Sequence, residues 1–91
     1  MSVKVRVPTQ LRALAGGAGE VAVDGETVGD ALKALDAAHP GFSERLFDES
    51  GNLRRFVNVF VGEEDIRFLD GLSTAVPAGG VVSVVPAVAG G

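Results

Sequence analysis

Only one segment of this 91-residue sequence carries apolar residues at helical spacing over a length that suits a full helix. The segment is preceded by Thr27, and Asp30 three residues later completes a pattern similar to a capping box. His39-Pro40-Gly41 ends it, because Pro40 disfavours helical angles at the residue before it. The sequence therefore predicts one helix of about three turns. Its apolar stripe consists of Val28, Ala31, Leu32, Leu35 and Ala38.

Segments with strand character lie on both sides of this helix. Residues 3–7 alternate valine with lysine or arginine, which is the pattern of a strand with one buried and one solvated face. Residues 21–23 form a second short strand that Asp24-Gly25 closes. Glycines at positions 16, 17 and 19 mark a turn between the two, so we expect them to pair as a hairpin.

The second half of the sequence alternates strand-like segments with turn signals. In order, these are a short helical turn marked by Phe42, Leu46 and Phe47, an exposed loop at 48–52, a strand at 56–61, a turn at 62–65, a short edge strand marked by Ile66 and Phe68, and a final strand at 81–85 that Pro86 ends. We find no internal repeat and no interdomain linker.

The order of elements predicts an α+β fold: strand, strand, helix, strand, short strand, strand. This is the β-grasp or ubiquitin-like pattern, a mixed sheet of four to five strands with one main helix across one face. In that arrangement the first and last strands lie side by side in the middle of the sheet. We expect a single β-grasp domain at residues 1–86 and a flexible tail at residues 87–91 that leaves a rigid platform.

The tail reads Ala87-Val88-Ala89-Gly90-Gly91, directly after the final strand. Glycine has no Cβ, so a Gly-Gly end can pass through a narrow slot and present its carboxyl group to the active site of another protein. ATP can convert such a carboxylate to an acyl-adenylate, and a sulfur nucleophile can then replace AMP to leave a thiocarboxylate. The alternative interpretation is a frayed end without function, because the ends of domains are commonly disordered.

Composition excludes several other classes. The formal net charge of −4 and the absence of Trp and Tyr disfavour a nucleic-acid partner. The chain has no Cys, and therefore no disulfide, thiol nucleophile or thiolate metal ligand. No apolar run approaches the length that crosses a bilayer, and no signal peptide is apparent. We expect a cytoplasmic protein that binds another protein rather than a membrane.

Four segments together resemble the MoaD/ThiS family of ubiquitin-like sulfur carriers, and the likeness covers essentially the whole chain. They are residues 55–59 (RFVNV), 64–68 (EDIRF), 71–75 (GLSTA) and 84–91 (VVPAVAGG). The length, the segment at 43–46 (SERL) and the Pro-Ala-Val-Ala-Gly-Gly ending resemble the CysO branch of that family.

The resemblance implies that this chain is a protein co-substrate rather than an enzyme. An E1-like activating enzyme would bind ATP and magnesium, adenylate Gly91 and hand the product to a sulfur source. Gly90 would let the backbone pass through a close channel, and Ala89, Val88 and Ala87 would settle in a shallow groove of the partner. In the CysO branch the thiocarboxylate supplies sulfur for cysteine made from O-phosphoserine by a cysteine synthase.

Two other fates of the same adenylate remain open. The acceptor could instead be molybdopterin synthase, an enzyme of thiamine thiazole synthesis or a thiosugar synthase. Alternatively, Gly91 could form an isopeptide bond with a lysine of a target, as in a ubiquitin-like modifier. The resemblance favours the sulfur carrier.

An autonomous enzyme is a further alternative. Its ingredients would be His39 with Asp36, or Ser43 with Glu44, but a single His at a helix end more simply favours the helix dipole. Glu63, Glu64 and Asp65 are consecutive residues of a turn and are best interpreted as a solvated loop, so we assign no metal site. The pairs Gly16-Gly17 and Gly79-Gly80 are interpreted as turns rather than phosphate loops.

The exposed face of the sheet and the tail are the surfaces that carriers of this family present to their partners. Phe56, Phe60 and Val85 are our candidates for an apolar docking patch on that face, with the buried face as the alternative for each. Three arginines are candidates for charge pairs at its rim, with a scattered solvated surface as the alternative for each: Arg12, Arg55 and Arg67.

Overall fold

The structure, a computed structural model, describes residues 2–55 and 57–86. Within them it contains a five-stranded sheet and two α-helices. The strands are β1 (Ser2–Arg6), β2 (Glu20–Asp24), β3 (Val57–Val61), β4 (Glu64–Asp65) and β5 (Val81–Pro86), the helices are α1 (Val28–Ala38) and α2 (Phe42–Leu46), and the 3-10 segments are η1 (Thr9–Ala15), η2 (Ile66–Phe68) and η3 (Gly71–Ser73).

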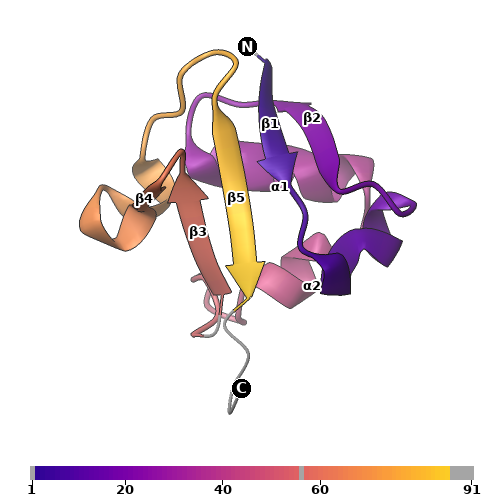
Figure 1. The fold of residues 1–91 in the computed structure, drawn as a ribbon. Coiled ribbons are helices and arrows are strands. Elements are labelled where there is room, and N and C mark those ends of the chain that lie inside the picture. Colours follow the sequence, from indigo (N-terminus) through magenta and orange to yellow (C-terminus); the bar gives the residue numbers. More distant parts are fainter. Residues whose placement is uncertain (1, 56, 87–91) are drawn as a thin grey trace.

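The sheet is mixed, with the strand order β2-β1-β5-β3-β4. β1 pairs antiparallel with β2, as the hairpin prediction required, and parallel with β5. β3 pairs antiparallel with both β5 and β4. The first and last strands are therefore neighbours, and β5 is the central strand (Figure 1). This arrangement confirms the predicted β-grasp class.

The core lies between the sheet and α1, which crosses one face (Figure 1). Val3, Val5 and Val7 are buried while the residues between them are exposed, as the alternation predicts. From α1, the residues Val28, Ala31, Leu32 and Leu35 are buried against this face. Ala38, which we expected in the same stripe, is exposed, because it lies in the last turn of the helix, beyond the sheet-facing residues.

The ends of α1 follow the sequence signals. The Thr27 hydroxyl oxygen accepts a hydrogen bond from the Asp30 amide at 3.2 Å, which satisfies one of the free N–H groups of the first turn. At the other end the His39 amide donates to the Leu35 carbonyl at 2.8 Å, and His39 itself has left the helical region. The helix therefore has the predicted bounds.

One segment was not anticipated from the sequence, and one local prediction was wrong. The segment η1, between β1 and β2, was not expected, although it contributes Ala15 to the core. The edge strand β4 is formed by Glu64 and Asp65, which we had placed in a turn, whereas η2 is a 3-10 turn rather than a strand. The Asp65 carboxylate accepts from the Arg67 amide at 2.9 Å, and this bond turns the chain out of the sheet.

Candidate docking face and tail exit

The central strand β5 leads to the tail. It is flanked by β1 and β3, and its last residue, Pro86, pairs with Val57 at the start of β3. The predicted reactive and tail residues, which are Gly91, Gly90, Ala89, Val88 and Ala87, lie outside the described residues, as does Phe56 of the predicted docking patch. Their roles, and the division into a domain at 1–86 and a tail at 87–91, remain predictions.

The face of the sheet opposite α1 carries both described members of the predicted docking patch. Val82, Val84, Val57 and Val59 belong to the core, so their neighbours in each strand point to the other face. Val85 is 46% exposed and lies opposite Asn58, while Phe60 is partly exposed and lies opposite Ser83. Phe60 and Val85 are therefore surface residues of β3 and β5 and do not belong to the core.

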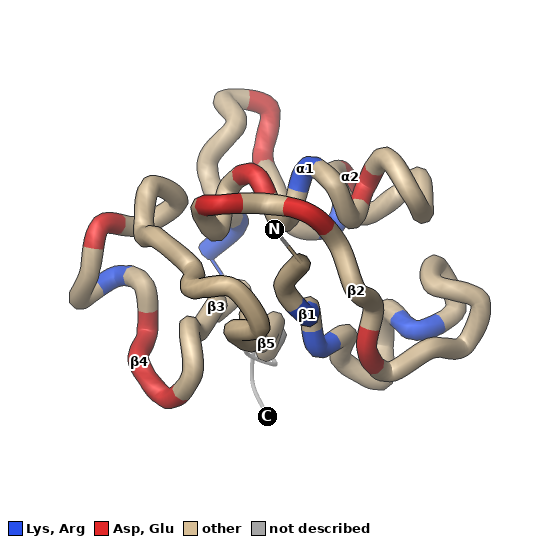
Figure 2. Tube along the Cα trace, turned by 90° about the horizontal axis from the view of Figure 1, so that it is seen from above, with Lys and Arg blue, Asp and Glu red and all other residues tan. Residues whose placement is uncertain are grey.

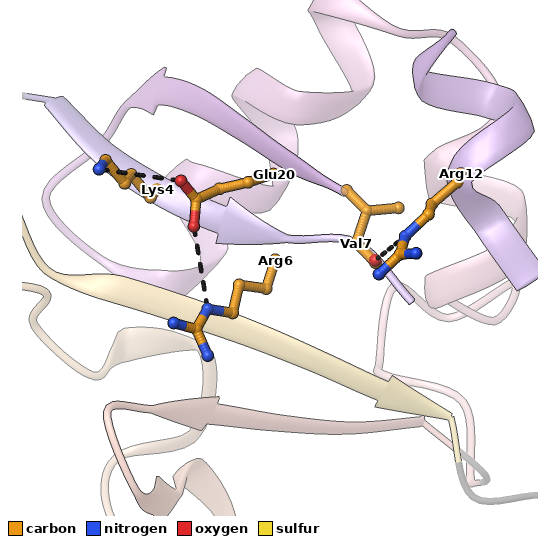
Figure 3. A network of polar contacts seen from close by, with 5 residues as sticks. All are labelled: Lys4, Arg6, Val7, Arg12 and Glu20. Carbon is orange, nitrogen blue, oxygen red and sulfur yellow. Dashed lines mark hydrogen bonds and ion pairs between the residues drawn. The ribbon is translucent and has the colours of Figure 1, made fainter. Parts of the chain in front are cut away.

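Charged residues continue this face onto the neighbouring strands. Lys4 and Arg6 of β1 pair in register with Val81 and Ser83 of β5, and both approach the Glu20 carboxylate on β2 at 3.8 Å (Figure 3). The side chains of Lys4, Arg6 and Glu20 are all exposed to solvent, so each of the two ion pairs contributes little to stability. The face thus combines an apolar strip on β5 and β3 with a polar border on β1 and β2.

Figure 2 shows that basic and acidic residues are spread around the described part of the molecule and do not form one basic stripe. A protein that binds a phosphate backbone concentrates lysine and arginine along one surface. The described part of the molecule does not have that arrangement.

The three predicted rim arginines do not lie together. Arg12 belongs to η1 and donates through Nε to the Val7 carbonyl at 3.1 Å (Figure 3), beside the β1–β2 side of the sheet. Arg67 lies at the other edge of the sheet, where its Nη2 donates to the carbonyls of Arg55 and Val57 at 3.2 Å each. Arg67 therefore contacts the backbone of Arg55, whereas Arg12 lies on the other side of the sheet.

Asp36, one of the residues considered for an autonomous enzyme, holds the backbone in place. The Asp36 carboxylate accepts from the amides of Ser43 at 2.9 Å and Gly41 at 3.2 Å. These bonds, chiefly the one from Ser43, lower the pKa of Asp36, against the opposing effect of its partial burial. Asp36 thereby caps α2, whose own N-cap residue Gly41 has no side chain. Sequence reasoning missed this role, because the cap comes from the preceding helix.

The described residues contain no group of three or more His, Cys, Asp or Glu side chains that could hold a metal ion. In the same part of the chain, none of the helices has the length and apolar character needed to span a membrane.

Comparison with known proteins identifies the family. The profile of the ThiS family matches residues 5–91. The chain belongs to the ThiS family. This ThiS-family protein is 48% identical to sulfur carrier protein CysO of Mycobacterium tuberculosis, over an alignment that covers 100% of both chains.

Solved structures agree with this assignment. The crystal structure of Mycobacterium tuberculosis CysO superposes with a TM-score of 0.89 at 46% identity, covering 94% of this chain and 99% of that one. The crystal structure of the Amycolatopsis orientalis BexX/CysO complex gives a TM-score of 0.91 at 42% identity, covering 98% of this chain and 99% of that one. The predicted family and its CysO branch are thereby confirmed. This ThiS-family protein is a sulfur carrier of the CysO type, a co-substrate and not an enzyme.

A modifier also resembles this ThiS-family protein. Small archaeal modifier protein 3 of Haloferax volcanii is 44% identical over 68 residues, which cover 75% of this chain and 73% of that protein.

Proposed function

We propose that this chain carries sulfur as a thiocarboxylate at Gly91 for the synthesis of cysteine from O-phosphoserine. An E1-like enzyme, using ATP and magnesium, activates the Gly91 carboxylate. One carboxylate oxygen attacks the α-phosphorus of ATP and releases pyrophosphate. A sulfur nucleophile then attacks the acyl carbon and AMP leaves, which gives the thiocarboxylate.

The thiocarboxylate is anionic near neutral pH and soft at sulfur. In the pocket of the acceptor enzyme its sulfur forms a bond to the β-carbon that O-phosphoserine supplies, and phosphate leaves from that carbon. Water later cleaves the carbon–sulfur bond of the carrier and restores the carboxylate for another cycle. The chain itself contributes no acid or base to these steps. Its part is to place the tail, on a body that the pairing of β5 with β1 and β3 makes rigid.

The observation that carries this proposal is the 48% identity to CysO over the full length of both proteins. Two features of the fold support it. The strand that leads to the tail is the central one of the sheet, and the face beside it presents Phe60 and Val85 to solvent. We propose that this face docks on the activating enzyme while the tail enters the adenylation site.

Intact-mass measurement tests the proposal. The full chain is incubated with a ThiS-type activating enzyme, ATP, magnesium and a sulfide source. Replacement of one carboxyl oxygen by sulfur raises the intact mass by the difference between the two atoms. The matched control lacks Gly91, and we expect it to fold normally but to release no pyrophosphate. Normal pyrophosphate release by this deletion variant would contradict the proposal.

The enzyme that accepts the sulfur is identified by adding candidate enzymes, each with its own substrate, to the thiocarboxylate form of the carrier. We expect sulfur transfer with a cysteine synthase that uses O-phosphoserine. Transfer could instead occur only with a BexX-type enzyme, a thiosugar or molybdopterin synthase, or an enzyme of the thiamine pathway. That result would support the thiocarboxylate but contradict the role in cysteine synthesis.

Protein modification is a second candidate, which the similarity to small archaeal modifier protein 3 favours. Both fates begin with the same adenylate and differ in the nucleophile. Chain isolated from its own cells distinguishes them, because a thiocarboxylate changes only the terminal atom whereas conjugation adds a whole target protein.

A further inference from the structure

The sheet is narrow where β5 leads to the tail. Among the described residues, β1 pairs with β5 only over residues 81–83, so the end of β5 has β3 as its one strand neighbour. On its other side, β3 pairs with β4 only at Phe60 and Val61. Where Val57 lies opposite Pro86 the described sheet is therefore two strands wide (Figure 1). A ribbon of two strands twists strongly and is marginally stable, so the position of Pro86 depends on what holds the start of β3.

The edge strand β4 ends before it can cover the start of β3. Extending its register with β3 would place Arg67 opposite Asn58. Instead, the Asp65 carboxylate accepts from the Arg67 amide at 2.9 Å, and the chain enters the 3-10 turn η2. The backbone carbonyls at the start of β3 are thereby left without the strand that would have supplied N–H donors on that side.

The side chain of Arg67 takes the place of the missing strand. Its Nη2 donates to the carbonyls of Arg55 and Val57 at 3.2 Å each. Hydrogen bonds from a charged donor are stronger than those between neutral groups. The backbone of Arg67 is itself fixed, by the Asp65 carboxylate on its amide and by the neighbouring Ile66, which is 2% exposed and belongs to the core. Arg67 therefore joins the start of β3 to an anchored point of the domain.

The acidic residues of the same turn do not draw the guanidinium away from these carbonyls. Glu63, Glu64, Asp65 and Asp70 flank Arg67 in the sequence. Within the part of the chain that the structure describes, none of their carboxylates lies at ion-pair distance from the Arg67 guanidinium. Their charge still attracts the guanidinium over a longer distance. The cation is thus compensated inside the chain, and its contacts with β3 require no acidic partner.

We propose that Arg67 is a positioning residue for the activation of Gly91. It holds the start of β3 and, through the pairing of Val57 with Pro86, sets the place from which the tail departs toward the adenylation site. A small displacement of a reacting group lowers the rate of a bound complex even where docking itself is unchanged. This inference rests on the proposed function, because it concerns the step that adenylates Gly91.

The first test compares steady-state pyrophosphate release with wild-type carrier and with Arg67→Ala, Arg67→Lys and Arg12→Ala. We expect Arg67→Ala to lower kcat by about tenfold while the KM for the carrier changes by less than about twofold. Arg67→Lys should recover most of kcat, because one nitrogen makes both bonds and lysine keeps a cationic donor on a flexible chain. Arg12→Ala is the matched control, since it removes a guanidinium-to-carbonyl bond, to Val7 at 3.1 Å, on the other side of the sheet. It should leave kcat and KM unchanged.

The second test needs no partner enzyme. Amide hydrogen exchange is measured by NMR for Asn58 and Val85, which lie opposite one another beside the tail exit. We expect Arg67→Ala to accelerate exchange at these two amides at least about threefold more than at Leu35 in α1, because the opening is local. Arg12→Ala should show no such difference. Arg67 is exposed, so all variants should keep a cooperative thermal unfolding transition.

The outcomes separate this inference from the proposed function. With active wild-type carrier, an unchanged kcat for Arg67→Ala would overturn the inference alone. A raised KM with normal kcat would also overturn it, because that result indicates direct contact of Arg67 with the enzyme. Equal acceleration of exchange at Leu35 would reduce Arg67 to a general contribution to stability. Absence of pyrophosphate release from the wild type would overturn the proposed function and this inference with it.

Discussion

Val57 of β3 pairs with Pro86 of β5, and the pairing of these two strands continues back to Val82. On its other side the first half of β5, from Val81 to Ser83, is paired with β1. The end of β5 that leads to the tail is held by β3. We therefore expect changes beyond Pro86 to leave the described domain folded.

A valine at position 90 should block activation without unfolding the protein. We expect Gly90→Val to reduce adenylation by at least about a hundredfold, because a small displacement of a reacting group in an active site already costs that much. Pyrophosphate release measures this, with circular dichroism as the check on folding. Ala78→Val, at an exposed site near the start of β5, is the control and should react normally. Equal rates for the two variants would contradict the role given to Gly90.

Removing the Asp36 carboxylate should destabilise α2. Asp36→Ala leaves the Gly41 and Ser43 amides without their acceptor, and loss of a helix cap costs about 1 kcal/mol. Asp36→Asn keeps one acceptor oxygen and should lose less. Urea unfolding at neutral pH gives the free energies of unfolding. If Asp36→Ala were as stable as wild type, the capping role would be wrong.

The same carboxylate predicts the pH dependence of stability. Its pKa in the folded protein is lower than the ordinary value of 3.8, so its contribution is fully present above that value and is lost as the pH falls through the lowered folded pKa. We expect the stability difference between wild type and Asp36→Asn to be constant at neutral pH and to diminish in acid below the ordinary value. A difference that grows on acidification would have the wrong sign.

Gly25 should tolerate no side chain. A Cβ built there would lie 2.7 Å from the Ala31 amide nitrogen, which belongs to the backbone of α1 and cannot rotate away. We expect Gly25→Ala to lower the free energy of unfolding by about 1–3 kcal/mol. The control is Gly19→Ala, whose added methyl meets the end of the Arg12 side chain at 3.2 Å. That end is hydrogen-bonded to the Val7 carbonyl but can shift, unlike backbone, so the cost should be smaller, at about 1 kcal/mol or less. If both variants lost similar free energies of unfolding, the close contact between Gly25 and the backbone of α1 would not be the cause.

The ion pairs of Glu20 should matter little for stability. Both distances are 3.8 Å and the side chains are largely exposed, so we expect Glu20→Gln to change the free energy of unfolding by less than about 1 kcal/mol. The difference should fall further in high salt. Urea titrations at low and high salt measure it, and a larger loss that salt does not reduce would indicate another role for Glu20.

Periodic segments were predictable from the sequence, and short segments were not. The alternation of Val3, Val5 and Val7 and the helical spacing after Thr27 gave correct elements because each pattern repeats over several residues. A strand of two residues such as β4 has no period to detect. The helical spacing of Leu11, Leu14 and Ala15 was present in the sequence and could have indicated η1.

The site could be predicted only in part. The apolar residues of β3 and β5 were found from composition, but their face is set by the register with the core, which one sequence does not contain. Phe68 was placed in a strand because it follows Ile66 at a spacing of two, and it is the Asp65 cap that turns it into solvent instead. Arg67 contacts β3 across 10 residues or more of sequence, so no local pattern could reveal its partners.

The parallel pairing of β1 with β5 has a practical result for handling the protein. The Gly79 amide donates to the Ser2 carbonyl at 2.9 Å, which places Ser2 beside the beginning of β5. The six residues of β5 separate that point from Pro86 by about 20 Å. A fluorophore or an affinity handle joined ahead of Ser2 would lie at the opposite end of β5 from Pro86. We therefore expect carrier that is immobilised on a resin through Ser2 to remain a substrate for soluble activating enzymes.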